Sequence, residues 1–119
     1  MDFFFSQDKL QRAVPAETRI LSLRAEPYPD RARLHVHLEL TPFQARPYIE
    51  VTLRDADGNE VATSSILEPL SWKLEFTMHL RLKADPAGEY SLEARLYFPD
   101  GPKAEPVRYD FSIPTAQNE

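Results

Sequence analysis

The sequence contains no cysteine, and this absence excludes two kinds of structure. A disulfide framework and a thiolate metal site both require cysteine side chains. The fold must therefore be held together by packing alone.

Glycine is also scarce, and the three glycines stand far apart. A phosphate-binding loop needs clustered glycines whose backbone N–H groups surround the phosphate, so a loop of that type is excluded. The segment from Asp55 to Glu60 is acidic like a calcium loop, but its Gly58 is at the fourth position and strands flank it, unlike an EF-hand loop. We expect a hairpin turn in which Gly58 adopts a positive φ.

Basic residues are too few and too scattered for nucleic-acid binding. The chain has 14 Lys and Arg against 19 Asp and Glu, for a net charge of −5, whereas binding to a phosphate backbone needs clustered cations. No segment approaches the roughly 20 apolar residues of a membrane span. The aromatic run Phe3 to Phe5 lacks the basic flank and cleavage site of a signal peptide. We expect no membrane insertion and, if Met1 is the natural start, a cytoplasmic protein.

The 119 residues suit one domain, and from Thr18 onward apolar and polar side chains alternate. Alternation with a period of two is typical of strands that bury one face. The predicted strands are 21–25, 34–40, 49–54, 61–66, 72–82, 90–98 and 107–113. The fourth contains Ala, Thr and Ser and is predicted to be an exposed edge strand. About seven short strands without intervening helices predict an all-β sandwich over residues 18–114.

The ends of the chain differ from this pattern. Residues 1–17 are expected to form a short N-terminal arm with room for one or two helical turns after Ser6, since Pro15 stops any helix. Residues 115–119 are expected to be a disordered tail.

The segment from Asp85 to Leu92 resembles the start of the sixth strand in immunoglobulin-like and fibronectin type III-like domains. In those domains a tyrosine two residues before a core position forms the tyrosine corner, and Tyr90 and Leu92 have this spacing. The cysteine of disulfide-bearing relatives is missing, and Trp72 follows the edge strand instead of lying in the third strand. The resemblance implies a seven-stranded antiparallel immunoglobulin-like β-sandwich, and it implies nothing about chemistry.

The resemblance also implies that the third, sixth and seventh strands share one sheet. Opposite charges then favour a register with Glu50 opposite Arg95, which places Tyr48 opposite Tyr97. Pairing Phe98 with Val107 would place Arg95 opposite Asp110 and Tyr97 opposite Arg108. The outer face would carry a ladder of Glu50, Arg95 and Asp110 capped by Tyr48, Tyr97 and Arg108. This face is either a solvated set of ion pairs or a binding surface for a sugar, a peptide or a second subunit.

Two further aromatic residues are candidates for binding. Phe43 lies in the proline-rich loop from Thr41 to Tyr48, where it is either presented to a partner or tucked under the core. Phe4 lies in the N-terminal arm, and an exposed aromatic run there would form an apolar patch that packs on its own domain or on a neighbour.

The three histidines are candidate metal ligands. His35 and His37 lie on one side of a strand, as two neighbouring metal ligands must, and His79 faces outward from the fifth strand. The resemblance also implies that the second and fifth strands are sheet neighbours. Placing His35 directly opposite His79 would set Arg33 against Arg81, whereas a register shifted by two residues avoids such like-charge pairs and keeps the histidines within diagonal reach. The alternative is that all three histidines are simply solvated.

Catalysis is not indicated by the sequence. It has no Cys and no Gly-x-Ser-x-Gly motif, and its paired carboxylates fall on solvated strand faces. We therefore expect a non-catalytic protein-interaction or self-association module without a cofactor, with a protein partner or a second copy of itself in a homodimer. The first alternative is a module that binds carbohydrate or another small ligand. The second is a metal-binding protein that uses the surface histidines.

Overall fold

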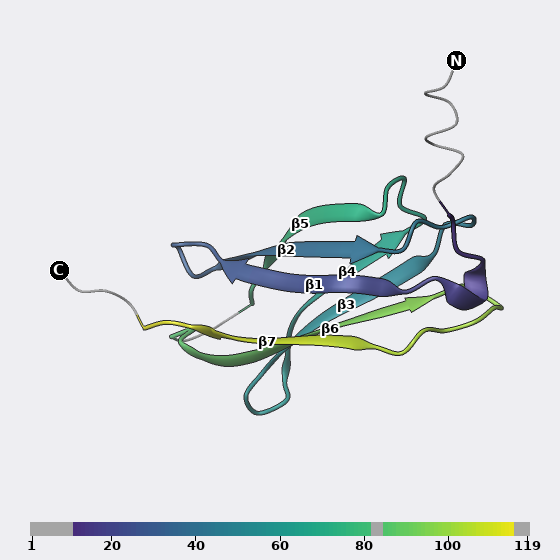
Figure 1. Ribbon diagram of the computed structural model, residues 1–119. Coiled ribbons are helices and arrows are strands. Elements are labelled where there is room, and N and C mark those ends of the chain that lie inside the picture. Colours follow the sequence, from purple (N-terminus) through teal and green to yellow (C-terminus); the bar gives the residue numbers. More distant parts are fainter. Residues whose placement is uncertain (1–10, 82–84, 116–119) are drawn as a thin grey trace, which may run out of the picture.

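The computed structural model describes residues 11–81 and 85–115, and it consists of two antiparallel sheets that pack as a sandwich (Figure 1). The expected helical turns after Ser6 and most of the expected tail lie outside the described residues. The seven strands are β1 (Ile20–Pro27), β2 (Arg33–Leu40), β3 (Tyr48–Asp55), β4 (Glu60–Leu67), β5 (Lys73–His79), β6 (Gly88–Tyr97) and β7 (Val107–Ile113). The predicted all-β sandwich is confirmed.

The strand order is β1-β2-β5 in one sheet and β4-β3-β6-β7 in the other. The expectations that β2 and β5 are neighbours, that β3, β6 and β7 share a sheet, and that β4 is an edge strand are confirmed. In the seven-stranded constant-type immunoglobulin arrangement, the fourth strand instead joins the sheet of the first, second and fifth. Here β4 hydrogen-bonds to β3, so the sandwich has three strands in one layer and four in the other.

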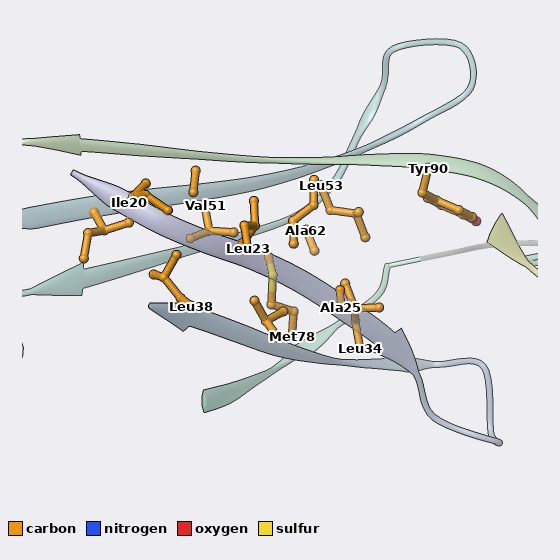
Figure 2. Close-up of a cluster of buried hydrophobic side chains, with 14 of the residues drawn as sticks. Ile20, Leu23, Ala25, Leu34, Leu38, Val51, Leu53, Ala62, Met78 and Tyr90 are labelled. Carbon is orange, nitrogen blue, oxygen red and sulfur yellow. The ribbon is translucent and has the colours of Figure 1, made fainter. Parts of the chain in front are cut away.

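The core lies between the two sheets and is built from the inward-facing side chains of alternate residues (Figure 2). Leu34 and Leu38 of β2 face Val51 and Leu53 of β3, and all four are at most 2% exposed. Burial of one such side chain stabilises the fold by roughly 1.5–3 kcal/mol. The period-two pattern therefore predicted the dry face of these strands correctly.

Leu21 departs from this pattern. It was predicted to face inward with Leu23, but it is 59% exposed, whereas Ile20 is 9% exposed. The register of β1 against β2 shifts between Ile20 and Ser22, so Leu21 is the extra residue of a β-bulge. An extra residue reverses the facing on one side of the bulge, which is why Leu21 points to solvent and Ile20 joins the core.

The turn between β3 and β4 is the hairpin expected at Gly58, which has a φ of +86°. The side chain of Asp55 organises it, because Oδ1 accepts hydrogen bonds from the backbone N–H groups of Asp57 (3.0 Å) and Asn59 (2.9 Å). A side-chain oxygen that bonds to following backbone N–H groups is a common way to fix a turn. One of the acidic residues of this segment, Asp55, thus fixes the turn, whereas Glu60 pairs with Arg54.

The tyrosine corner is also present. Tyr90 is 6% exposed, and its hydroxyl donates a 2.6 Å hydrogen bond to the carbonyl oxygen of Pro86. This bond ties the start of β6 to the segment that precedes it, as in the domains that the segment resembles.

Residues 11–17 are attached to the loop before β3. Ala13 donates a 2.7 Å hydrogen bond to the Pro42 carbonyl oxygen and accepts a 2.9 Å one from the Gln44 N–H. A short 3₁₀ helix follows at Pro15–Glu17. Within residues 11–81 and 85–115, no helix is long and apolar enough to cross a membrane.

Candidate functional site

An apolar row crosses one end of the outer face of the four-stranded sheet. Tyr48 of β3 lies opposite Tyr97 of β6 on one side and opposite Leu67 of β4 on the other. The two tyrosine rings have centroids 5.7 Å apart and planes inclined by 49°, and Leu67 is 60% exposed. We call Leu67, Tyr48 and Tyr97 the apolar row. The pairing of Tyr48 with Tyr97 was predicted, whereas Leu67 was not identified because the register of β4 was not worked out.

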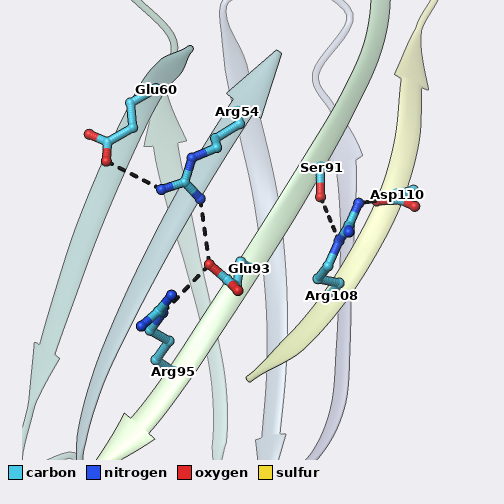
Figure 3. A network of polar contacts seen from close by, with 7 residues as sticks. All are labelled: Arg54, Glu60, Ser91, Glu93, Arg95, Arg108 and Asp110. Carbon is cyan, nitrogen blue, oxygen red and sulfur yellow. Dashed lines mark hydrogen bonds and ion pairs between the residues drawn. The ribbon is translucent and has the colours of Figure 1, made fainter. Parts of the chain in front are cut away.

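A polar network covers the middle of the same face (Figure 3). Glu93 of β6 accepts a 3.5 Å hydrogen bond from Arg54 and forms an ion pair with Arg95 at 3.5 Å. Arg54 also lies 3.6 Å from Glu60 of β4. These ion pairs are at the surface, where each is worth about 0–1 kcal/mol. Their effect is to fix side-chain positions on this face more than to stabilise the fold.

The predicted ladder of Glu50, Arg95 and Asp110 is wrong in part. Glu50 is opposite Arg95, as expected, but its carboxylate accepts a 3.0 Å hydrogen bond from Ser65. The β6–β7 register differs from the expected one by four residues, and Asp110 is therefore opposite Ser91. The ladder does not extend onto β7.

Arg108 is the second residue that this register displaces. It lies opposite Glu93, not opposite Tyr97, and it bonds to Asp110 at 3.1 Å and to Ser91 at 3.1 Å (Figure 3). The shift has a local cause, because the turn after β6 closes on itself: the Phe98 N–H donates to the Pro102 carbonyl oxygen at 3.0 Å. Arg108 thus belongs to the polar network and not to the apolar row.

Of the two remaining aromatic candidates, the structure tests the prediction for Phe43 and does not describe Phe4. Phe43 is 6% exposed and packs against Trp72, so the expectation that it is presented to a partner is corrected and the alternative, burial under the core, holds. Phe4 lies outside the described residues.

A second set of side chains lies on the outer face of the three-stranded sheet. His35 and His37 project from the central strand β2, with ring centroids 4.3 Å apart. His35 is paired with Glu26 of β1 and His37 with Glu75 of β5. The carboxylate of Glu75 lies 3.1 Å from Nε2 of His35 and 3.8 Å from Nδ1 of His37, and that of Glu26 lies 3.8 Å from Nε2 of His37.

His79 does not join this set. The β2–β5 register is shifted by two residues from direct His35–His79 opposition, as predicted, and it places His79 opposite Arg33. The guanidinium of Arg33 pairs with Asp30 at 2.8 Å and lies 4.2 Å from the centre of the Tyr28 ring. Sequence reasoning named the three histidines and missed Glu26 and Glu75, which only the pairing of β1 and β5 with β2 brings beside them.

A hollow of about 600 Å³ lies between the β3–β4 turn and the segment before β6. Its carboxylates are those of Asp55, Asp57, Glu60, Asp85 and Glu89. Asp55 bonds to turn N–H groups, and Asp85 accepts from the Ala87 N–H at 3.0 Å and from Arg31 at 3.1 Å. These two bonds hold the pKa of Asp85 below its ordinary value, the Ala87 bond being the larger cause. The two carboxylates therefore serve the loop structure.

No protein-family model and no curated protein matches the chain. Among solved structures, the chain is similar to part of a β-glucuronidase from Parabacteroides merdae, with a TM-score of 0.59 over 81% of this chain and 13% sequence identity. The chain spans only 14% of the length of that structure. At this identity the likeness shows the fold alone, a β-sandwich of two antiparallel sheets.

Proposed function

We propose that this chain is a non-catalytic interaction module that forms a homodimer through the outer face of the four-stranded sheet. The observation that carries the proposal is the apolar row: Leu67, Tyr48 and Tyr97 stand side by side on three neighbouring strands. Leu67 is exposed and the two tyrosines are half-buried, and contiguous apolar and aromatic side chains that water can reach are what protein interfaces enrich at their centre.

The charges around the apolar row favour a second copy over a strongly charged partner. The ion-paired network combines three arginines with three carboxylates, namely Arg54, Arg95 and Arg108 with Glu60, Glu93 and Asp110. Glu50 of the same face adds a fourth carboxylate opposite Arg95, so this face alternates both signs with a small negative excess, whereas the whole chain carries a net charge of −5. A two-fold interface presents the same patch from both subunits, and a patch that alternates both signs can complement itself.

The geometry of the two tyrosines favours protein over carbohydrate. Their rings are inclined by 49° and do not form one flat surface on which a sugar ring could lie across both. The likeness to part of a β-glucuronidase extends to the fold only, so it adds no support for sugar binding.

Sedimentation velocity over a concentration series tests the homodimer with a matched pair of variants. Leu67 and Leu21 are 60% and 59% exposed and lie on strands of different sheets. We expect the wild type to shift with concentration from 13.7 kDa toward twice that mass. Leu67→Arg should remain monomeric, and Leu21→Arg should associate like the wild type.

A wild type that remains monomeric throughout the series overturns the homodimer. So does association that is lost in Leu21→Arg and kept in Leu67→Arg, because the contact would then involve the other sheet. A glycan array probed with the same proteins checks the alternative: binding that is lost in Tyr97→Ala would replace the homodimer with a carbohydrate-binding function.

A further inference from the structure

The outer face of the three-stranded sheet, on the opposite side of the sandwich from the apolar row, holds a compact group of nitrogen and oxygen ligands. One ligand atom from each of Glu26, His35 and His37 lies within 4.8 Å of the other two. The three residues come from adjacent strands: Glu26 is paired with His35 across β1 and β2, and His37 follows two positions later on β2. The hydrogen-bonded ladder thus holds all three Cα positions.

We propose that Glu26, His35 and His37 form a binding site for a divalent transition-metal ion of the zinc class. In a tetrahedral zinc site, bond lengths of about 2.0–2.2 Å place ligand atoms roughly 3.3 Å apart. The present separations are within about 1.5 Å of that value, which rotation of exposed side chains can supply. Two imidazoles with a carboxylate suit zinc and its neighbours, whereas calcium and magnesium prefer oxygen ligands alone.

The burial of the side chains divides the site into a fixed part and an adaptable part. The histidine side chains are 20% and 32% exposed, and they rise from a central strand that is paired on both sides. The side chain of Glu26 is 66% exposed and forms a 4.0 Å ion pair with the exposed Arg24, so to bind an ion it has to give up a surface ion pair, which is worth about 0–1 kcal/mol. An open position would remain for water or for a ligand atom from a partner.

Glu75 has a positioning role in this proposal. Histidines bound to a metal commonly donate their other ring N–H to a carboxylate, which fixes the tautomer and the ring orientation. Glu75 lies 3.1 Å from Nε2 of His35, where it can accept such a bond.

His79 provides the matched control. It is exposed on the same face, but its strand position is opposite Arg33, and it is not among the described residues whose ligand atoms lie close enough together to hold an ion. Loss of the His79 side chain should therefore leave the zinc affinity of a site made of Glu26, His35 and His37 unchanged.

Calorimetric titration of protein without a histidine tag with zinc chloride tests the site. We expect one ion per chain. Binding should be lost in His35→Ala and His37→Ala, kept in His79→Ala, and weakened about 10- to 100-fold in Glu75→Gln. Thermal unfolding measured with and without zinc supplies a second readout, because an ion that binds only the folded chain raises Tm in the wild type and in His79→Ala and does not in His35→Ala or His37→Ala.

The imidazole resonances of the wild-type protein keep the proposal falsifiable if an alanine variant fails to fold. Zinc should shift the signals of His35 and His37 and leave those of His79 unchanged. Absence of zinc binding, binding that persists without His35 and His37, or binding that depends on His79 would each overturn the proposed ligand set. The homodimer is tested by variants of the other sheet, so each proposal can fail without the other.

Discussion

The rings of Phe43 and Trp72 meet edge to face, with centroids 6.1 Å apart and planes at 87°. This contact joins the loop before β3 to the segment before β5. Aromatic pairs in this geometry contribute about 0.5–1.5 kcal/mol beyond the area that they bury. Phe43 therefore anchors the loop before β3 to the core, although Gln44, Ala45 and Arg46 of the same loop are exposed.

Phe43→Ala should destabilise the fold by about 3–5 kcal/mol, because it removes a buried ring and leaves a cavity. Denaturant unfolding followed by fluorescence measures this directly, since Trp72 is the only tryptophan of the chain. Val14→Ala is a control on the same end of the sandwich, where the side chain is 41% exposed, and it should change stability by less than about 0.5 kcal/mol. A Phe43 variant as stable as that control would contradict the packing role.

The bulge in β1 predicts opposite results for two leucines that are two residues apart. Leu23→Ala should cost about 2–5 kcal/mol, since Leu23 is 7% exposed. Leu21→Ala should cost less than about 0.5 kcal/mol, since its side chain is 59% exposed. Urea unfolding of both variants checks the assignment, and equal losses would show that β1 continues without the bulge.

Tyr90→Phe should lower the free energy of unfolding by about 1 kcal/mol, because it removes the hydrogen bond to the Pro86 carbonyl oxygen while keeping the ring. Tyr97→Phe, on the solvated face, is the control and should be near neutral. The tyrosine corner is refuted as a stabilising contact if the two substitutions have the same effect.

The same residue predicts a dependence on alkaline pH. Burial raises the pKa of Tyr90 above its ordinary value of 10.0, and the nearby Asp55 and Asp85 add to the rise. A raised pKa means that the folded state prefers the neutral phenol, so this contribution to stability is complete below pH 10 and is lost as pH rises through the folded pKa. The unfolding temperature Tm, measured in a series of alkaline buffers, should therefore fall less steeply with rising pH for Tyr90→Phe than for the wild type.

Two loop aspartates predict a dependence on acid pH. The pKa of Asp85 lies below its ordinary value of 3.8 because the Ala87 N–H and Arg31 bond to it, and Asp30 is lowered in the same way, first by the Ala32 N–H and then by Arg33. A lowered pKa gives a contribution to stability that is present above pH 3.8 and is lost as pH falls through the folded pKa. The Asp30→Asn, Asp85→Asn double variant should lose less stability on acidification than the wild type, as measured by thermal unfolding between neutral pH and pH 3. If the double variant loses as much stability on acidification as the wild type, both carboxylate contacts are contradicted.

The strands and their buried faces could be predicted from the sequence because alternation records which side of each strand is dry. The β3–β6 register could also be predicted, because placing Glu50 directly opposite Arg95 pairs opposite charges and leaves room for the expected turns. The β6–β7 register could not, because the alternative alignment opposes Glu93 and Arg108 and satisfies the same charge rule. What decides between the two is the backbone hydrogen bond from Phe98 to Pro102. Pro, Asp and Gly predict a turn at this point, but their presence alone does not say which two residues close it.

The candidate sites show the same limit. The shared side of His35 and His37 follows from their spacing alone. Glu26 could not be assigned to them, because its place depends on pairing beyond the bulge at Leu21. Leu67 likewise joins the tyrosines only once β4 is known to pair with β3.

The central pairings in both sheets join strands that are distant along the chain, β2 with β5 and β3 with β6. The long chain segments between these paired strands must form closed loops before the strands can pair. Folding is therefore expected on the millisecond-to-second scale of non-local β topologies. During synthesis, β3 has only β4 as a sheet neighbour until β6 has left the ribosome. The nascent chain therefore has to keep the apolar face of β3 away from other chains until β6 has been made.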